Sequence, residues 1–327
     1  SCSTNFVPVL PSDPVPLIYG MINPQDSIYN IRLSKTFAGA GNALDFAKIP
    51  DSLYYQGAKV FLETRDTSGT LIQRVQMEET VIEDREPGLF AVSPNRIFRT
   101  DASQLHLGTD YFSGLGLPYT VNLHVKAVIP GYADTVQAVS LLRSAPRIVQ
   151  PRNALVKIYL YSDETFWMQW YDTNKESMFQ ILIRMHYTDF LADTKREMTA
   201  EWVLSGIEVN TSSLTGASRT ICSYYFRPEN FYAQISSAIP KDPEVEARVC
   251  GKFDFIVLSS DKELEYYRNI YDISDDYHAA GYTNVKNGYG LFTTYTTTGI
   301  YGMTMGPTEL DSLAGGRYTS DLKFKNW

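Results

Sequence analysis

Cys2 is the residue whose position in the sequence indicates the most specific chemistry. It stands in Ser1-Cys2-Ser3-Thr4-Asn5, directly before a stretch with four prolines in residues 7–16. Bacterial lipoproteins are cleaved just before a cysteine whose thiol is acylated, and a short polar tether follows it. We therefore expect Cys2 to be a lipidation site and residues 1–16 to be the tether. The alternative is an ordinary cysteine at a frayed terminus.

The other two cysteines, Cys222 and Cys250, could form a disulfide bond. Export permits oxidation, and the bond would close a loop of about 28 residues, worth roughly 3 to 4 kcal/mol in the chain-entropy model. Strand parity argues against the bond, because the apolar alternation over residues 245–255 points Cys250 the other way unless Gly251 marks a bulge. A disulfide bond and two separate thiols both stay open.

Motifs of the common catalytic and cofactor sites are absent from the sequence. The histidines at positions 106, 124, 186 and 278 form no His-Glu-x-x-His pair, and there is no Cys-x-x-Cys. The chain also lacks a Gly-x-Ser-x-Gly elbow, a Walker loop and a Gly-x-Gly-x-x-Gly fingerprint. We expect no catalytic residue in a local motif, no metal site and no cofactor.

Acidic residues are densest at Glu83, Asp84 and Glu86, directly before Pro87-Gly88. This pattern favours a solvated turn over an acid/base pair. Because the two carboxylates of a glycosidase are brought together by the fold and not by sequence spacing, a hydrolase directed at glycans or peptides stays as an alternative.

Trp167 is the candidate ligand-binding residue. It lies in residues 166–171, which are expected to form a strand with Phe166, Met168 and Trp170 on one face and Trp167 on the other. We assign the first three side chains to the core. An exposed indole could stack on a sugar ring or a peptide, although aromatic residues more often serve in cores.

Composition indicates a folded protein of about two domains. The chain has 327 residues, 44% of them hydrophobic and 20% charged, and a net charge of −8. Its basic residues are scattered, which argues against nucleic acid as a partner. No apolar run approaches the roughly 18 to 20 residues of a membrane-spanning helix, so we expect any attachment to a membrane to occur through the lipid anchor.

Short β-branched and aromatic runs between turn residues predict a β-sandwich in the first part of the chain. The expected strands are 17–21, 28–33, 58–64, 71–77, 88–93, 120–128 and 134–142. Two prolines, Pro146 and Pro151, then flank a short extended piece. We place the boundary there, which gives domains of residues 17–148 and 149–327.

The second part is expected to be β-rich with one or two helices. Strands are predicted at 157–161, 166–171, 178–187 and 291–305. Helical spacing of apolar residues predicts one helix at 228–239, behind a proline suited to a first turn. A second helix is predicted at 261–275, where residues 260–263 have the spacing of a capping box.

Several short segments resemble a family of Bacteroidetes outer-membrane lipoproteins known only as a domain of unknown function. They are IYGMI at 18–22, GAKV at 57–60, EPGLF at 86–90, GTDY at 108–111, VNLHV at 121–125, SDKELEYY at 260–267, NVKNGYGLF at 284–292 and LDSLA at 310–314. Genes of this family often lie near SusC/SusD-type nutrient-uptake genes. The resemblance implies an Ig-like or transthyretin-like N-terminal sandwich, a larger β-rich C-terminal domain and an outer-membrane anchor at Cys2. It implies no catalysis, and residues 3–6 lack the acidic residues often found on surface-exported members, which leaves the membrane face open.

We therefore expect a cell-envelope lipoprotein with a non-enzymatic binding role. Its ligand would be a glycan, a peptide or a partner protein, with a place beside a SusC/SusD-type uptake complex or in cell adhesion. The alternatives are the hydrolase described above and a structural component of the envelope. A deep pocket lined by two facing acids would favour the hydrolase, and a shallow aromatic surface would favour binding.

The anchor can be tested in cells. Expression of the precursor with Cys2→Ala should release the protein from the membrane fraction, because acylation would be lost and no apolar span would replace it. Membrane fractionation measures this result. A Cys2→Ala variant that still sediments with membranes would disprove the anchor.

Overall fold

The computed structural model describes residues 14–36, 49, 52–82, 94–115, 120–152, 157–160, 165–174, 177–205, 207, 209–213, 219–273 and 282–325. This part of the chain is mainly β, with three sheets of nine, four and four strands and a few short helices. Among the described residues, no helix combines the length and apolar character needed to cross a membrane. Cys2, Glu83, Asp84, Glu86 and the strand expected at 88–93 lie outside the described residues.

Two compact units alternate along the chain. The first takes the described residues of Ser1–Arg143 and Ser260–Tyr295, and the second takes those of Ser144–Ser259 and Thr296–Trp327. This division differs from the expected domains 17–148 and 149–327. The first crossing between the units, at Arg143 and Ser144, lies just before the expected boundary. Residues 260–295, which come late in the chain, belong to the first unit.

The late segment returns because β16 (Tyr289–Met303) pairs in parallel with β1 (Pro16–Ile22). The register runs from Leu17 opposite Tyr289 to Ile22 opposite Thr294. A parallel partner from far along the chain leaves no local signal in the sequence, because the connection between such strands is long. The prolines at 146–151 therefore marked one crossing between the units and could not reveal the others.

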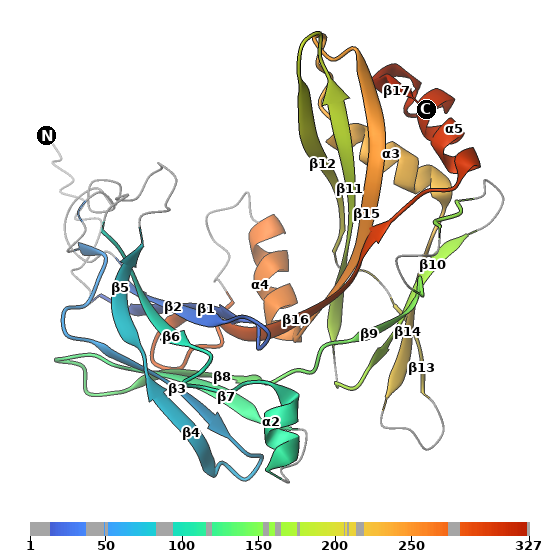
Figure 1. Cartoon of the computed structure of the whole chain (residues 1–327). Helices are drawn as coiled ribbons and strands as arrows, with labels where there is room; N and C mark the ends of the chain where they lie inside the picture. Colours follow the sequence, from blue (N-terminus) through green and yellow to red (C-terminus); the bar gives the residue numbers. More distant parts are fainter. Residues whose placement is uncertain are drawn as a thin grey trace, which may run out of the picture. The chain divides into compact units, whose positions relative to one another are not determined.

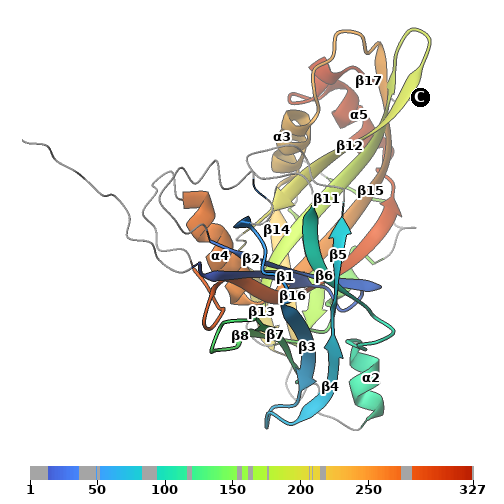
Figure 2. The same cartoon turned by 90° about the vertical axis from the view of Figure 1, so that its left-hand side faces the viewer.

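The first unit is built from two sheets that share a hydrophobic core (Figures 1 and 2). Within this unit their orders are β16-β1-β2-β6-β5 and β4-β3-β7-β8. The strands are β2 (Ile28–Lys35), β3 (Lys59–Arg65), β4 (Leu71–Gln76), β5 (Glu78–Ile82), β6 (Asn95–Asp101), β7 (Asn122–Val128) and β8 (Val136–Leu141). The strand predicted at 28–33 is confirmed as β2, in which Tyr29, Ile31 and Leu33 are buried and Ile28 is exposed. Core residues from both sheets show that the sheets pack face to face.

Buried hydrogen bonds hold the returning segment in the first unit. The carboxylate of Asp261 accepts hydrogen bonds from Ser140 Oγ at 3.0 Å and Thr293 Oγ1 at 2.7 Å. Asp261 also precedes α4 (Lys262–Ile273), where its Oδ1 accepts the Leu264 N–H at 3.4 Å. The predicted second helix is thus confirmed, and the observed cap is Asp261 instead of the first residue of the predicted capping box.

The second unit also combines two sheets, with two helices on the larger one (Figure 1). Their orders in this unit are β12-β11-β15-β16, with β17 beside β15, and β13-β14-β10-β9. The elements are β9 (Arg147–Gln150), β10 (Phe166–Asp172), β11 (Met178–Phe190), β12 (Lys195–Leu204), β13 (Asn210–Ser213), β14 (Thr220–Phe226), α3 (Pro228–Ala238), β15 (Ala247–Ser260), α5 (Pro307–Gly315) and β17 (Phe324–Lys325). The strand predicted at 178–187 is confirmed as β11, whose residues Ile181, Ile183, Met185 and Tyr187 are all buried. The first predicted helix is confirmed as α3.

Several strands were not predicted, among them β6, β12 and β14, and three short features also differ from the expectations. The helix α2 (Thr109–Gly114) and the helix α5 were not predicted, and α2 has only 6 residues. The described part of the strand predicted at 157–161 forms a single bridge, Ile158 opposite Met305. Elements this short depend on tertiary packing more than on propensity, because a single helical turn is marginal by itself.

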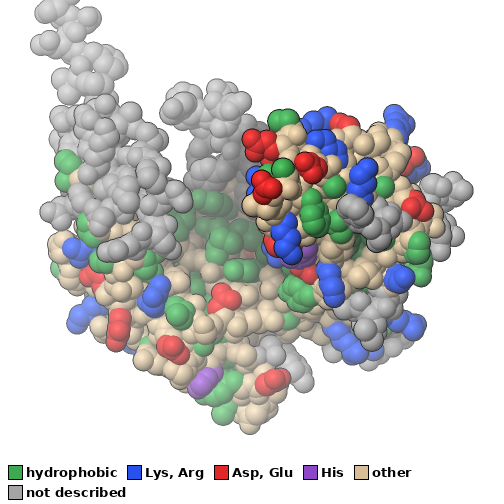
Figure 3. Space-filling view, turned by 45° about the horizontal axis from the view of Figure 1, so that its top comes forward, with side chains coloured by type: hydrophobic (Ala, Val, Ile, Leu, Met, Phe, Trp, Pro, Cys, Tyr) green, Lys and Arg blue, Asp and Glu red, His purple; other side chains and the backbone are tan. Residues whose placement is uncertain are grey.

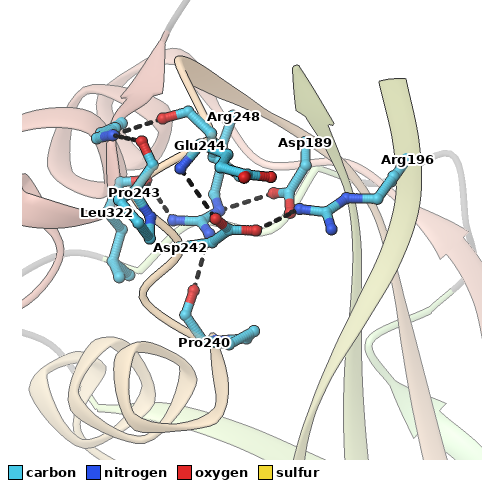
Figure 4. Close-up of polar contacts among 10 residues, drawn as sticks. Asp189, Arg196, Pro240, Asp242, Pro243, Glu244, Arg248 and Leu322 are labelled. Carbon is cyan, nitrogen blue, oxygen red and sulfur yellow. Dashed lines mark hydrogen bonds and ion pairs between the residues drawn. The ribbon is translucent and has the colours of Figure 1, made fainter. Parts of the chain in front are cut away.

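A buried ion pair joins four segments of the second unit (Figure 4). Both side chains of the Arg248–Asp189 pair are 2% exposed, and Arg248 Nε donates to Asp189 Oδ1 at 2.8 Å. The other two guanidinium nitrogens donate to Leu322 O and Pro240 O, each at 2.8 Å. Arg196 lies on the outer side, within 2.6 Å of Asp242. Burying a charge is tolerated only with such partners, so this cluster fixes β15, β11, the loop after α3 and the C-terminal turn together.

The return of β16 leads to a stability prediction. Residues 17–143 expressed alone should not fold stably, because they lack the core residues Val285 and Phe292 and the partner strand of β1. Loss of one buried Phe typically costs about 3–5 kcal/mol, against a total stability of roughly 5–15 kcal/mol. Circular dichroism and amide exchange will measure the outcome.

The matched control is the same fragment joined through a flexible linker to residues 260–295, which should recover cooperative unfolding. Native-like exchange protection in the unextended fragment would contradict the role given to β16.

Candidate functional site

Trp167 and Tyr225 form an exposed aromatic pair on the second unit. They are directly opposite each other across β10 and β14, and their exposed fractions are 43% and 50%. Met168 and Trp170 are fully buried on the other side of β10, and Phe166 packs partly against the same core. The predicted exposure of Trp167 and the predicted core role of its neighbours are therefore confirmed.

The pair belongs to one side of the β13-β14-β10-β9 sheet, which we call the outer face. Strand register places on it Arg147, Gln150, Trp167, Gln169, Tyr171, Asn210, Ser212, Ile221, Ser223 and Tyr225. Arg219 directly precedes β14 and joins the face through its contact with the Tyr171 ring. All the other residues come from four strands, so the face is part of the sheet and not a loop. Rigid elements hold binding groups more accurately than loops do.

Amide and hydroxyl groups lie beside the aromatic pair. Gln169 is two residues after Trp167 on the same face, and its Nε2 donates to Ser223 Oγ at 3.2 Å. Gln150 on β9 is opposite Gln169, and Asn210 on β13 is opposite Ser223. Each side-chain amide offers both donors and an acceptor. The middle of the outer face can thus hydrogen-bond to a ligand that carries hydroxyl groups.

Two arginines mark the far end of the outer face. Tyr171 is opposite Arg147 across β9 and β10. The guanidinium carbon of Arg219 lies 4.4 Å from the centre of the Tyr171 ring, which is the geometry of a cation–π contact. Both arginines are exposed, and no described residue of the outer face is acidic. This end of the face therefore carries positive charge.

A separate cavity lies in the second unit between α3, α5 and the loop that follows α5. Its volume is about 400 Å³, within the usual range for small-molecule sites. It is lined by Leu160, Pro228, Glu229, Tyr232, Thr308, Ser312, Gly316, Arg317, Tyr318 and Thr319. Among the described lining residues Glu229 is the one carboxylate, so these residues do not supply the two facing acids that would favour a glycosidase.

His186 and Asp254 form the closest histidine–carboxylate contact among the described residues, with His186 Nε2 2.7 Å from Asp254 Oδ2. Asp254 Oδ1 also accepts the Gly302 N–H at 3.0 Å, which ties β16 to β15. In the described ranges, no group of three His, Cys, Asp or Glu side chains is placed to hold a metal ion. The pair therefore has an evident structural use in the sheet.

Cys222 and Cys250 carry free thiols in the structure, which is the second of the two alternatives left open by the sequence. Cys222 is opposite Trp170 on the core side of the sheet. Burial, helped by the nearby charge of Asp172, raises the pKa of Cys222 to about 12. Burial also raises the pKa of Cys250 to about 12. Both thiols are protonated at neutral pH, which makes them poor nucleophiles.

The sequence reasoning missed Tyr225, Arg147 and Arg219. The alternation of Ile221, Ser223 and Tyr225 was the available signal for the outward direction of Tyr225. No local signal could pair it with Trp167, because that register joins strands more than fifty residues apart.

Comparisons with known proteins give little guidance. No family model matches the sequence, and no curated protein matches it. One solved structure with some similarity is trypsin-activated alpha-2-macroglobulin from Escherichia coli, at 11% identity and a TM-score of 0.19. The match covers 76% of this chain but 14% of that chain, so this chain spans a small part of its length. A TM-score this low carries no argument about fold or function.

The state of the cysteines can be tested by alkylation without reductant. Cys222 and Cys250 should react slowly with iodoacetamide at pH 8 in the native protein, since a raised pKa leaves little thiolate. Both should react quickly in guanidinium chloride, and peptide mass spectrometry will locate the label. If neither residue is labelled after unfolding until a reductant is added, a disulfide bond is present and the free thiols are wrong.

Proposed function

We propose that the protein is an envelope lipoprotein that binds a glycan on the outer face and is not an enzyme. The observation that carries the proposal is the exposed pair of Trp167 and Tyr225 on a rigid sheet. Burying an indole and a phenol ring under a flat sugar ring removes apolar area from water, and aromatic rings supply that area with few rotatable bonds. Gln150, Gln169 and Asn210 beside the pair are suited to the hydroxyl groups of the same ligand.

The direction of the pair, out of the plane of the sheet, favours a glycan over an extended peptide. A peptide commonly binds a sheet by adding a strand to an open edge, where backbone groups hold it. Trp167 and Tyr225 pair with each other across β10 and β14, and their exposed rings lie on the face of the sheet. A ligand that lies on the outer face is held by such side chains, which suits stacking on a sugar.

The cellular setting follows from the sequence expectations. The cysteine near the start of the chain, the proline-rich tether and the resemblance to Bacteroidetes lipoproteins support an outer-membrane anchor. Glycan capture in that location would serve a SusC/SusD-type uptake complex or adhesion. For the first unit we propose an Ig-like or transthyretin-like module, supported by its two packed sheets with a common core.

Binding can be tested with single substitutions and a panel of soluble polysaccharides. Trp167→Ala and Tyr225→Ala should each weaken binding by roughly 5- to 30-fold, the loss expected when a stacking side chain worth about 1–2 kcal/mol is removed. Affinity electrophoresis or calorimetry measures the change. The melting temperature should stay nearly constant, because both side chains are exposed.

Tyr289→Ala is the matched control, since Tyr289 is 52% exposed on the first unit and should not affect binding. Binding that survives both outer-face substitutions would disprove the location of the site. Turnover of a bound polysaccharide by the wild type would disprove the non-enzymatic role.

A further inference from the structure

We propose that the ligand of the outer face is an anionic oligosaccharide, with a carboxylate or sulfate group held by Arg147 and Arg219. This inference rests on the proposed glycan-binding function and deepens it. It is carried by the charges at the Tyr171 end of the face.

The outer face has a charge opposite to that of the whole chain. The protein has a net charge of −8, yet this face has two arginines and no acidic residue among its described members. Figure 3 shows one side of the molecule, on which acidic and basic side chains both occur. A local field of one sign selects ligands of the other sign.

Some arginines of the same unit are neutralised by a carboxylate, whereas Arg147 and Arg219, like Arg227 and Arg317, form no ion pair with a described residue. Arg184, Arg196 and Arg248 each form an ion pair with a carboxylate. Neither Arg147 nor Arg219 has a described carboxylate within ion-pair distance. Stacking on Tyr171 orients the flat guanidinium of Arg219 and leaves its N–H edge for a ligand oxygen. Guanidinium groups bind carboxylate and sulfate oxygens in a paired geometry.

The separation of the two ends implies more than one sugar ring. Trp167 and Tyr171 lie four residues apart on β10, which is roughly 13 Å at the rise of a β-strand. A ligand that stacks on the aromatic pair and also reaches the arginines must be an oligosaccharide. Gln169 and Gln150 lie between the two ends, where the connecting sugar would pass.

The test compares polymers that differ in charge alone. Polygalacturonate and its methyl ester share one backbone, as do dextran sulfate and dextran, so the two pairs separate a carboxylate from a sulfate requirement. At low salt, wild-type protein should bind the charged member of one pair at least about tenfold more tightly than its neutral counterpart. Each guanidinium group is expected to raise the affinity by up to about fivefold. The preference should shrink as salt rises, because exposed charges are screened.

Two double variants test whether Arg147 and Arg219 cause the preference for the charged polymer. The double variant Arg147→Gln, Arg219→Gln should lose the preference and keep the affinity for the neutral polymer. The double variant Arg147→Lys, Arg219→Lys should keep part of the preference, because it keeps the charge and loses the paired guanidinium geometry. Arg317→Gln is the matched control, since Arg317 is exposed beside the Tyr318 ring in the same unit but lies away from the outer face.

Equal affinity for charged and neutral polymers would overturn this inference, and so would a preference that is unchanged in the Gln variant. In both cases the glycan proposal still stands if Trp167→Ala weakens binding. A Lys variant that behaves like the Gln variant would also overturn it. If none of the four polymers binds and a peptide library yields ligands that depend on Trp167, the glycan proposal and this inference both fail.

Discussion

A guanidinium group buried in the second unit has to be neutralised and hydrogen-bonded where it lies, and Arg248 meets this requirement through Asp189 and two carbonyl groups. Removing one partner of such a pair typically costs about 3–5 kcal/mol. The two carbonyls belong to Pro240, just after α3, and to Leu322, in the turn after α5. The cluster therefore fixes the segment after α3 and the turn after α5 against β11 and β15. Side chains of both helices and of β10 and β14 belong to one hydrophobic core, which lies behind the outer face.

The outer face joins two kinds of recognition on one rigid surface. The aromatic pair offers apolar area, whereas the arginine end offers charge, and the side-chain amides lie between them. Stacking alone tolerates many sugars, because every pyranose ring has a flat apolar side. Charge adds selectivity, since a neutral ligand would leave the two guanidinium groups without a new partner.

Local patterns predicted those parts of the fold that depend on one segment at a time. The strands β2 and β11 were predicted from local residue types, and alternation in β10 predicted its buried side and the exposure of Trp167. Helical spacing and a first-turn proline predicted α3. The parallel pairing of β1 with β16, and the pairing of Trp167 with Tyr225, could not be predicted in the same way, because both join distant segments and a strand shows nothing of its partner's identity. Trp167 could therefore be predicted by itself, whereas the other residues of the outer face could be identified only from the register of the strands.

The alternation of the two units along the chain sets the order in which they can form. A ribosome makes β1 early and β16 last among the strands of the first unit, with Ser144–Ser259 made between them. Until then β1 is an open strand edge, and such edges attract strands of other chains. Synthesis therefore cannot deliver one finished unit and then the next. The first unit reaches completion only after β16 has been made, and until then holding factors that cover open strand edges would matter most.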